Sequence, residues 1–415
     1  MRSTRTFGLV VLVGAMTVLA APTARAHARD SQLLYVGSGS TITALSADTG
    51  AVRFTTPSAI ATRDWSRVYS TQARPSATIL RTSDARSGAT IATRRLAPGL
   101  GLRAVSDDGT ALVLTPSTPT GANPYQATAR ATTPLTIVRG SAAPRTYMVD
   151  GNVEPEAFSL STRTLFVIEY TPPTAPERYR VARISLTGHR ANVTPRAVRS
   201  NEDELQEPMR GTARAQTMAP DGRRLYTLYT RDATATAPAE AFVHVLDLEH
   251  ERATCVDLPA EFAANPVGAV AVSPSGTRLY VVSPATAAVA ELDVASLTVA
   301  RTGHLPTPSS ATTVRATVTN NTTMYVSTDS AVTVVDLRAL TPRSTWTFPE
   351  RITGIQPASV AGTLFVSLPD RVVEVDEASG APRRLYPVAA TGPIDHVAPA
   401  LRPISEVDGS VQCAC

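Results

Sequence analysis

The sequence predicts an all-β protein, a single ring of repeated four-stranded units, and three observations support this prediction. A turn followed by a strand, of the form Ser-x-Asp-Gly-x-x-Leu-Tyr-Val, returns along most of the chain. Strand-forming residues and 32 prolines are spread through the repeats, which excludes repeated helical units. The repeats recur at intervals of about 40–50 residues, the length of a four-stranded blade. Together these features predict a single β-propeller of antiparallel blades.

Each unit contains the same elements in the same order. A short apolar stretch comes first, then a turn of Asp, Asn, Ser or Gly residues, then a strand rich in β-branched and aromatic residues. A variable loop, a strand that ends in Asp-Leu or Asp-Val, and a last strand that ends near proline complete the unit. Alternating apolar residues between turn formers are typical of strands, and Asp-Gly turns are typical of hairpins because they tolerate positive φ. The clearest copies are Ala219-Pro220-Asp221-Gly222-Arg223-Arg224-Leu225-Tyr226 and Ser273-Pro274-Ser275-Gly276-Thr277-Arg278-Leu279-Tyr280-Val281.

The number of blades follows from the second strand of each unit. An apolar residue near the start of this strand, which we call the marker residue, recurs eight times at spacings of 34 to 60 residues: Leu34, Val68, Leu112, Leu165, Leu225, Leu279, Met324 and Leu364. We therefore expect eight blades. Seven blades is the alternative, because the first two units are short.

The two ends of the chain are expected to meet in one blade. The first unit lacks an inner strand ahead of residues 32–37, and residues 394–403 supply a candidate for it. A ring closed by the N- and C-terminal strands removes the free edges that would otherwise invite aggregation.

The first 26 residues read as a secretory signal peptide. Arg2 and Arg5 precede an apolar run over residues 7–21, and Ala24-Arg25-Ala26 supplies a cleavage site. A membrane anchor fits less well, because the run is shorter than the roughly 20 residues that a spanning helix needs. We therefore expect a secreted or extracytoplasmic protein with three segments: a signal peptide (1–26), a β-propeller (27–404) and a C-terminal tail (405–415).

The charged residues limit the classes of function. All 39 basic residues are arginines, so no lysine nucleophile or Schiff base is available. The chain without its first 26 residues carries 36 basic and 35 acidic residues. No basic block with interleaved aromatic residues is present, which argues against nucleic-acid binding. We expect a monomer that neither binds nucleic acid nor inserts into a membrane after the signal is removed.

The repeats also resemble a known group. Two segments look like the Tyr-Val-Thr-Asn type of bacterial β-propeller, which is described as WD40-like: Leu33-Leu34-Tyr35-Val36-Gly37 and Arg278-Leu279-Tyr280-Val281-Val282. Residues 152–159, 166–170 and 241–248 further resemble exported actinobacterial propellers without assigned activity. The resemblance implies the fold, usually with seven blades, and implies no function, since unrelated functions share such folds.

Candidate site residues were sought in the loops that enter the innermost strands and in the loops that follow the second strands, because both open on one face beside the axis. The fourth and fifth units are richest there. Glu154 and Glu156 precede an inner strand, and alternation along a strand would place them on the same side. Glu169 ends a second strand. The fifth unit adds Arg210 and Arg214 before its inner strand, and Tyr229 and Arg231 at the end of its second strand.

These seven residues could form a ligand clamp, an acid/base pair or a structural network of ion pairs. We predict a ligand-binding role for them and no catalytic residue, metal ligand or cofactor. His244 and His396 are expected to be structural. The acidic run at residues 201–207 lacks the spacing of a calcium loop and is expected to be solvated. Cys255 could bridge Cys413 or Cys415, and the sequence does not decide between a bridge and unpaired thiols.

Three functions remain open at this stage. The first is an exported non-catalytic propeller that binds a protein, the cell envelope or a small molecule at the face beside the axis. The alternative is a lactonase-type hydrolase that uses Glu, Arg and His at the same mouth. An electron-transfer or quinone-linked protein is the weakest, because no haem-attachment motif is present.

Overall fold

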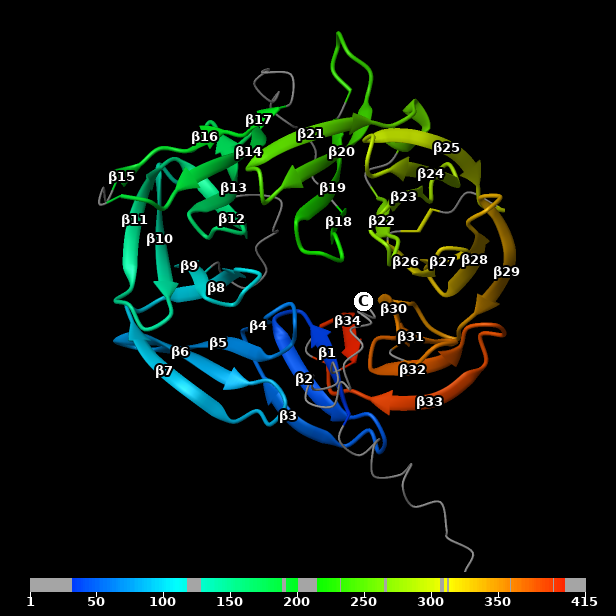
Figure 1. The fold of residues 1–415 in the computed structure, drawn as a ribbon, viewed down its shortest axis with the longest axis horizontal. Coiled ribbons are helices and arrows are strands. Elements are labelled where there is room, and N and C mark those ends of the chain that lie inside the picture. Colours follow the sequence, from blue (N-terminus) through cyan, green and yellow to red (C-terminus); the bar gives the residue numbers. More distant parts are fainter. Residues whose placement is uncertain are drawn as a thin grey trace, which may run out of the picture.

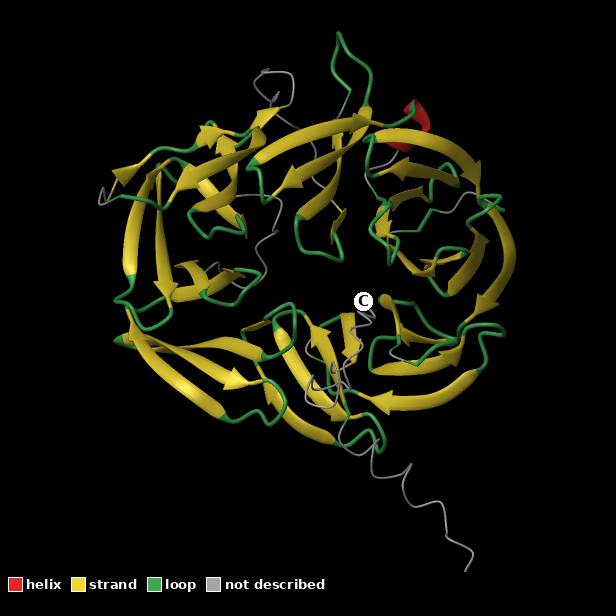
Figure 2. Cartoon of the chain, in the orientation of Figure 1, coloured by secondary structure: helices red, strands yellow, loops and turns green. Residues whose placement is uncertain are grey.

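The computed structural model describes residues 32–117, 128–188, 192–200, 215–231, 233–264, 267–306, 310–311, 313–358, 360–390 and 392–399. In these residues, eight sheets stand around a central axis like the blades of a propeller (Figure 1). Six sheets have four strands, and two have a fifth, two-residue strand at the outer edge. Almost every regular element is a strand, and η1 (Ala260–Ala263) is a single short turn of 3₁₀ helix (Figure 2).

We number the blades around the ring and give the strands of each from the axis outward. Blade 1 contains β34 (Ile394–Pro399), β1 (Leu33–Ser38), β2 (Thr41–Ser46) and β3 (Val52–Thr56). Blade 2 contains β4 (Ala59–Ala61), β5 (Arg67–Arg74), β6 (Ala77–Asp84) and β7 (Thr90–Leu96). Blade 3 contains β8 (Leu100–Val105), β9 (Ala111–Pro116), β10 (Thr132–Arg139), β11 (Arg145–Asp150) and β15 (Asn192–Val193). Blade 4 contains β12 (Asn152–Phe158), β13 (Thr164–Thr171), β14 (Arg178–Ser185) and β16 (Arg196–Ala197).

The second half of the ring follows the same order. Blade 5 contains β18 (Ala215–Met218), β19 (Arg224–Arg231), β20 (Glu240–Asp247), β21 (Arg252–Asp257) and β17 (Arg199–Ser200). Blade 6 contains β22 (Ala269–Val272), β23 (Arg278–Ser283), β24 (Ala288–Asp293) and β25 (Thr298–His304). Blade 7 contains β26 (Val314–Asn320), β27 (Thr323–Thr328), β28 (Ala331–Asp336) and β29 (Thr341–Thr347). Blade 8 contains β30 (Gly354–Pro357), β31 (Thr363–Ser367), β32 (Arg371–Asp376) and β33 (Pro382–Pro387).

The two ends of the chain close the ring in blade 1, as the sequence predicted. Antiparallel β34 pairs with β1 from Leu34 to Ser38, and Figure 1 shows it beside β1 at the axis. The Ser38 hydroxyl donates to the Gly392 carbonyl at 2.7 Å, and the Thr353 hydroxyl of blade 8 donates to the Ile394 carbonyl at 2.6 Å. Eight blades and closure by both termini are therefore confirmed, and the alternative of seven blades is wrong. Residues 400–415, including the predicted tail, lie outside the described residues.

A six-residue turn joins the inner and second strands and explains the repeated Asp-Gly phrase. In blade 5 the amide of Ala219 donates to the Arg224 carbonyl at 2.8 Å, and the amide of Gly222 donates back to the Ala219 carbonyl at 2.9 Å. The fourth residue of the turn adopts positive φ, which is +72° at Gly222. The same position is held by Trp65, Gly109, Thr162 and Gly276 in blades 2, 3, 4 and 6.

The seams between neighbouring blades share one contact. The residue that follows each third strand donates its backbone amide to the carbonyl of the residue just before the second strand of the same blade. Its carbonyl, which we call the seam carbonyl, accepts a hydrogen bond from the preceding blade. The seam carbonyls of blades 1 to 8 are those of Ala47, Ala85, Gly140, Leu186, Leu248, Val294, Leu337 and Glu377.

The donors to these carbonyls differ from seam to seam. A tyrosine hydroxyl donates at four seams, from Tyr35, Tyr147, Tyr325 and Tyr386 at 2.8 to 3.2 Å. An arginine donates without a tyrosine at three, from Arg94, Arg224 and Arg301, and Arg384 joins Tyr386 at the Ala47 carbonyl. The amide of Leu160 donates at the seam between blades 4 and 5.

The core lies between the blades rather than within one sheet. Facing apolar side chains of successive blades form clusters, for example Val243 and Val245 of blade 5 with Val281 of blade 6. Such face-to-face packing of twisted sheets is what alternating apolar residues in every strand produce. No helix in the described part of the chain is long and apolar enough to cross a membrane.

A short segment outside the expected pattern ties three blades together. Between residues 192 and 200, β15 pairs in parallel with β11 of blade 3, β16 is the outer strand of blade 4, and β17 pairs in parallel with β21 of blade 5. One stretch of nine residues therefore runs along the outer edges of blades 3, 4 and 5, and the last two hold predicted site residues.

Candidate functional site

The predicted site residues lie on blades 4 and 5. We call the face that carries the loops into the inner strands and the loops after the second strands the loop face, and the opposite face the turn face. Glu154 and Glu156 are in β12, Glu169 is in β13, and Tyr229 and Arg231 are in β19. Arg210 and Arg214 lie outside the described residues.

Glu154 and Glu156 lie within the inner strand, not before it as the sequence analysis expected. The intervening Pro155 suggested a loop, yet it pairs with Val167 of β13 in the ladder. Proline is compatible with this position because β12 is the innermost strand of its sheet, and an edge strand can place a residue without an N–H away from its one neighbour. A bulge between Pro155 and Ala157 then sets the direction of Glu156.

Glu154 is held by a phenol and lies near a guanidinium. The Tyr170 hydroxyl donates to Glu154 Oε2 at 2.9 Å. Arg130, from the loop between β9 and β10, donates through Nε to Asn152 Oδ1 at 2.8 Å. Burial lowers the pKa of Arg130, and the charge of Glu154 opposes that shift. The Glu154 carboxylate thus compensates a half-buried cation on the loop face.

The loops around Arg130 are locked by amide contacts. Asn152 Nδ2 donates to the carbonyls of Thr128 and Pro173, each at 3.0 Å, and the amide of Arg130 donates to the same Pro173 carbonyl at 3.1 Å. Asn152 therefore joins the loops of blades 3 and 4 at the start of β12. The sequence analysis missed Arg130 and Asn152, because a loop arginine and a strand-initial asparagine belong to no repeat that would single them out.

Glu156 joins the inner strands of blades 4 and 5. Gln216 Nε2 of β18 donates to Glu156 Oε1 at 2.9 Å and to Thr227 Oγ1 at 3.0 Å. Gln216 thus links Glu156 of blade 4 to Thr227 of blade 5.

Glu169 and Arg231 have ionic partners on their own blades. Arg180 Nε of β14 binds Glu169 Oε2 at 2.7 Å, and Arg231 Nη1 binds Glu240 Oε2 at 3.1 Å. The Arg231 guanidinium also lies over the Phe242 ring, 5.1 Å from its centre. Both groups therefore contribute to links between second and third strands.

Tyr229 is fully buried in an aromatic cluster between blades 4 and 5. Its ring centre lies 5.8 Å from those of Tyr179 and Phe242 and 5.9 Å from that of His244. Burial lowers the pKa of His244 to about 4, so its imidazole is neutral at physiological pH. The structure thus makes Tyr229 a core residue, whereas Glu154 and Glu156 are only partly buried on the inner strand.

The wall of inner strands is apolar on its other side. A groove of about 240 Å³ runs along blades 5 to 8 and is lined chiefly by Thr217, Val270, Val272, Ala316, Val318 and Pro357. Pro220 and Pro274, in the turns after β18 and β22, also line this groove, so it reaches the turn face.

The turn face is bridged across the axis. Arg63, in the turn after β4, donates to the Pro220 carbonyl in the turn after β18 and pairs with Asp107, in the turn after β8. These contacts join the turn of blade 2 to the turns of blades 3 and 5. Blade 5 is not a neighbour of blade 2 in the ring.

The remaining candidates of the sequence analysis have structural surroundings. His396 of β34 stacks on Trp65, with ring centres 5.8 Å apart, and Trp65 stacks on Tyr35 at 4.5 Å. Cys255 is an exposed residue of the third-to-fourth-strand hairpin, on β21. Cys413, Cys415 and the acidic run at residues 201–207 lie outside the described residues. The described residues contain no group of three or more His, Cys, Asp or Glu placed to hold a metal ion.

Comparisons with known proteins identify the fold. No family model matches the sequence, and no curated protein matches it. Among solved structures, AztD from Citrobacter koseri is similar at a TM-score of 0.53 and 11% identity, over 89% of this chain and 97% of that one. The dihydro-heme d1 dehydrogenase NirN, solved in complex with DHE, is similar at a TM-score of 0.51 and 13% identity, over 87% of this chain and 74% of that one. At such identities the similarity shows a shared β-propeller fold, and the likeness to the Tyr-Val-Thr-Asn group stays a resemblance.

Proposed function

We propose that this protein is an exported, non-catalytic binding module that engages a protein, envelope or small-molecule ligand on the loop face beside the axis. The observation that carries the proposal is the pair Glu154 and Glu156 on the inner strand of blade 4. Both carboxylates are partly buried, both lie on a strand rather than a loop, and each is hydrogen-bonded to a neighbouring side chain, Glu154 to Tyr170 and Glu156 to Gln216. Rigid, pre-oriented polar groups beside the axis are what a propeller ligand site requires.

The charge of this pair defines the preferred ligand. Tyr170 hydrogen-bonds Glu154, and Gln216 hydrogen-bonds Glu156, so both carboxylates are oriented on the wall beside the axis. A carboxylate accepts several hydrogen bonds, and the strongest come from cationic donors. A ligand or partner that presents a cationic or hydrogen-bond donor group fits this wall best.

The site is tested by neutralising the pair. In the double variant Glu154→Gln and Glu156→Gln, ligands selected from a small-molecule and peptide library should lose binding, while the melting temperature stays close to that of the parent. The matched control is Asp370→Asn with Glu350→Gln, which removes two carboxylates around Arg371 on blade 8. The proposal fails if both double variants bind alike, or if a lactone or ester is hydrolysed by the parent and not by the first variant, which would favour the hydrolase alternative.

Glu156→Ala separates a binding role from a purely structural one. If Glu156 serves only the seam with Gln216, its loss should lower the free energy of unfolding by about 1–3 kcal/mol, without a separate binding defect. If it contacts the ligand, binding is lost while stability changes little.

Export is tested independently. Residues 1–26 should be removed, so N-terminal sequencing of protein collected from the culture medium or periplasm should begin at His27. Material that retains Met1, or that fractionates with membranes in the absence of other proteins, would contradict export as a soluble protein.

A further inference from the structure

A second polar cavity lies on the turn face, between blades 5 and 6, away from the carboxylate pair described above. Its volume is about 470 Å³, within the range of small-molecule sites. Three turns form its wall: the turn between β18 and β19, the turn after β20, and the turn between β22 and β23. At the seam that it occupies, the donor to the seam carbonyl is an arginine and not the tyrosine of the second strand.

The difference concerns Tyr226. Tyr35, Tyr69 and Tyr325 hold the same place in their second strands, one residue after the apolar marker, and each hydroxyl donates to a carbonyl of the next blade at 2.7 to 3.2 Å. Tyr226 is 1% exposed and lines the cavity, and its buried hydroxyl donates a hydrogen bond to no described residue, although the Arg224 side chain lies beside it. Buried polar groups without a partner are rare in folded proteins, so this hydroxyl needs an explanation.

Arg224 takes the carbonyl to which the Tyr226 hydroxyl would otherwise donate. Its Nη1 donates at 3.2 Å to the Val294 carbonyl, the seam carbonyl of blade 6, which is the type of acceptor that Tyr35 and Tyr325 use. The residues are two apart on β19, so their side chains leave the strand on the same side. The guanidinium has five N–H donors, of which the seam uses one.

Arg224 and Tyr226 together form a recognition pair for an oxyanion. Burial raises the pKa of the Tyr226 hydroxyl, and the nearby charge of Arg224 opposes that shift only in part. The phenol therefore stays protonated and donates. A guanidinium beside a phenol O–H is complementary to a carboxylate, which accepts charge-assisted hydrogen bonds from both.

The rim of the cavity offers acceptors instead. Arg223 Nη1 pairs with Glu249 Oε2 at 3.0 Å, and His250 Nδ1 pairs with Asp247 Oδ2 at 2.9 Å. Asp221 also lines the cavity. These pairs fix a carboxylate and an imidazole at the opening, where hydroxyl or amino groups of a bound molecule would find acceptors.

We propose that this cavity binds a small organic carboxylate whose other end carries hydroxyl or amino groups, with the carboxylate against Arg224 and Tyr226. A sugar acid and an amino acid both have this chemistry. The site does not rest on the proposed function, because it uses arginine and tyrosine donors on the turn face rather than the glutamates of the loop face.

The test is calorimetric titration of the secreted protein with D-gluconate, L-serine and D-glucitol, the last being gluconate with its carboxylate reduced to an alcohol. At least one of the two carboxylates should bind, and D-glucitol should bind at least about tenfold more weakly than D-gluconate if gluconate is the ligand. Binding of gluconate alone identifies a sugar-acid site. Binding of serine alone identifies an amino-acid site, and binding of both shows that the carboxylate dominates.

Two variants tie binding to the named residues. Tyr226→Phe should weaken binding at least about tenfold and change the melting temperature little, since its hydroxyl donates to no described residue. Tyr35→Phe, the matched position in blade 1, should lower the melting temperature and leave the affinity unchanged. Arg224→Gln, which retains an amide donor for Val294, should weaken binding in the same way.

The proposal is overturned if neither carboxylate binds at millimolar concentration, if D-glucitol binds as well as D-gluconate, or if Tyr226→Phe binds like the parent. Because Glu154→Gln with Glu156→Gln leaves this cavity intact, that double variant should bind the carboxylate normally. Loss of binding in that variant would place the site on the loop face and contradict the proposal.

Discussion

Gly222 and Gly276 occupy the same position of the six-residue turn in neighbouring blades, but their surroundings differ. Both have positive φ, +72° and +70°, where any L side chain is strained. A Cβ on Gly276 would meet only Pro220 Cδ, at 3.6 Å. A Cβ on Gly222 would lie 2.8 Å from Asp107 Oδ1 and 2.9 Å from Arg63 Cζ, in the contact that crosses the axis. Glycine is thus required at position 222 for two reasons: its backbone adopts positive φ, and no side chain fits between Asp107 and Arg63.

Replacing each glycine by alanine separates these two requirements. Gly276→Ala should lower the free energy of unfolding by about 1–2 kcal/mol through backbone strain alone. Gly222→Ala should cost more, because it must also displace Arg63 or Asp107. Urea unfolding of the two variants provides the comparison, and equal losses would mean that the contact across the axis contributes nothing.

His244 makes stability depend on pH. It is buried beside Tyr229, and its pKa is about 4 in the folded protein compared with 6.5 for an unperturbed histidine. Between these two pH values the unfolded chain binds a proton that the folded protein does not, so the free energy of unfolding should fall as pH decreases from 6.5 to 4. The contribution of His244 is fully present above pH 6.5.

Removing the imidazole should remove this part of the acid sensitivity. His244→Phe, which retains an aromatic ring beside Tyr229, should show a shallower loss of stability between pH 6.5 and 4 in denaturant titrations. His250→Gln is the control, because that histidine is exposed on a turn. Identical pH profiles for the parent and His244→Phe would show that burial of His244 does not cause the sensitivity.

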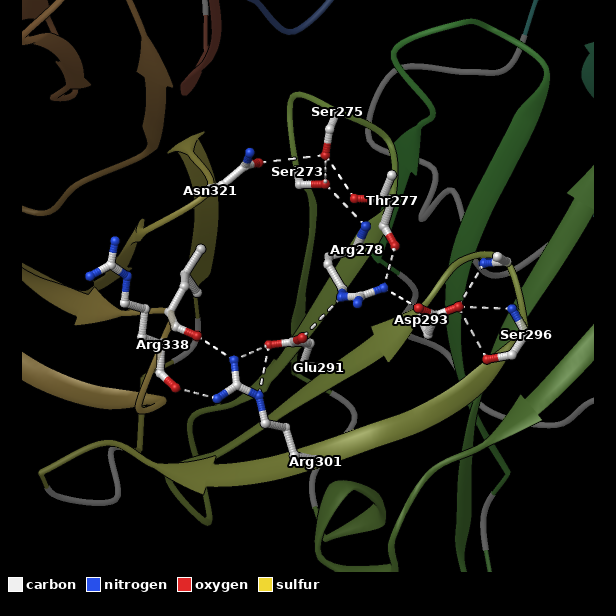
Figure 3. Close-up of polar contacts among 12 residues, drawn as sticks. Ser273, Ser275, Thr277, Arg278, Glu291, Asp293, Ser296, Arg301, Asn321 and Arg338 are labelled. Carbon is white, nitrogen blue, oxygen red and sulfur yellow. Dashed lines mark hydrogen bonds and ion pairs between the residues drawn. The ribbon is translucent and has the colours of Figure 1, made fainter.

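At the scale of elements, the seam between blades 6 and 7 depends on one buried carboxylate (Figure 3). Glu291 of β24 is bound by Arg278 Nε at 3.2 Å and by Arg301 Nη2 at 2.6 Å. Arg301 also donates to the carbonyls of Leu337 and Arg338 in blade 7. Glu291 therefore orients the arginine that reaches the next seam carbonyl.

Glu291→Gln should lower the free energy of unfolding by about 2–3 kcal/mol, because a hydrogen-bonded charge shared by two arginines is lost. Asp370→Asn, which removes an exposed carboxylate from Arg371, should cost less than about 1 kcal/mol. Thermal and urea unfolding measure both. A Glu291→Gln variant as stable as Asp370→Asn would mean that the seam holds without this network.

The strands were predictable from sequence because each obeys a local rule, whereas the contacts between blades were not. The marker residues Leu34, Leu225 and Met324 all fall in second strands, since alternation and turn residues act over a few positions. The seam donors come from different strands and residue types, so no single motif reveals them. Arg130 illustrates the same limit at the site: its partner Asn152 lies 22 residues away, and only the ring brings the two together.

The predicted site was recovered in part for the same reason. Glu154 and Glu156 come from one strand, so their shared location followed from local pattern. Tyr229 was predicted to face the axis because it ends a second strand, yet the packing of blade 4 against blade 5 buries its side chain. Burial of one side chain between two sheets depends on the partner sheet, which the local sequence does not contain.

At the scale of the whole molecule, three devices act on different parts of the ring. The segment at residues 192–200 ties the outer edges of blades 3, 4 and 5, and Arg63 links the turns of blades 2 and 5 across the axis. The third device is closure by β34, which buries Ile394 and Val397 against blades 1 and 8. Closure differs from the other two because it satisfies the inner edge of β1 and removes the free ends of the ring.

Deleting residues 394–415 should therefore destabilise the whole propeller rather than one blade. The deletion removes five paired residues of the β1 ladder, the hydrogen bond from Thr353 to Ile394, and the apolar contacts of Ile394 and Val397, so β1 and the neighbouring blade 8 lose a buried wall together. Because each blade packs on the next, we expect the melting temperature to fall in a single cooperative transition, with increased aggregation from the exposed edge. The matched control deletes only residues 405–415, the predicted tail, and should melt like the full chain. If the longer deletion also melts like the full chain, the pairing of β34 with β1 does not stabilise the ring, and the packing between blades must hold it closed without that strand.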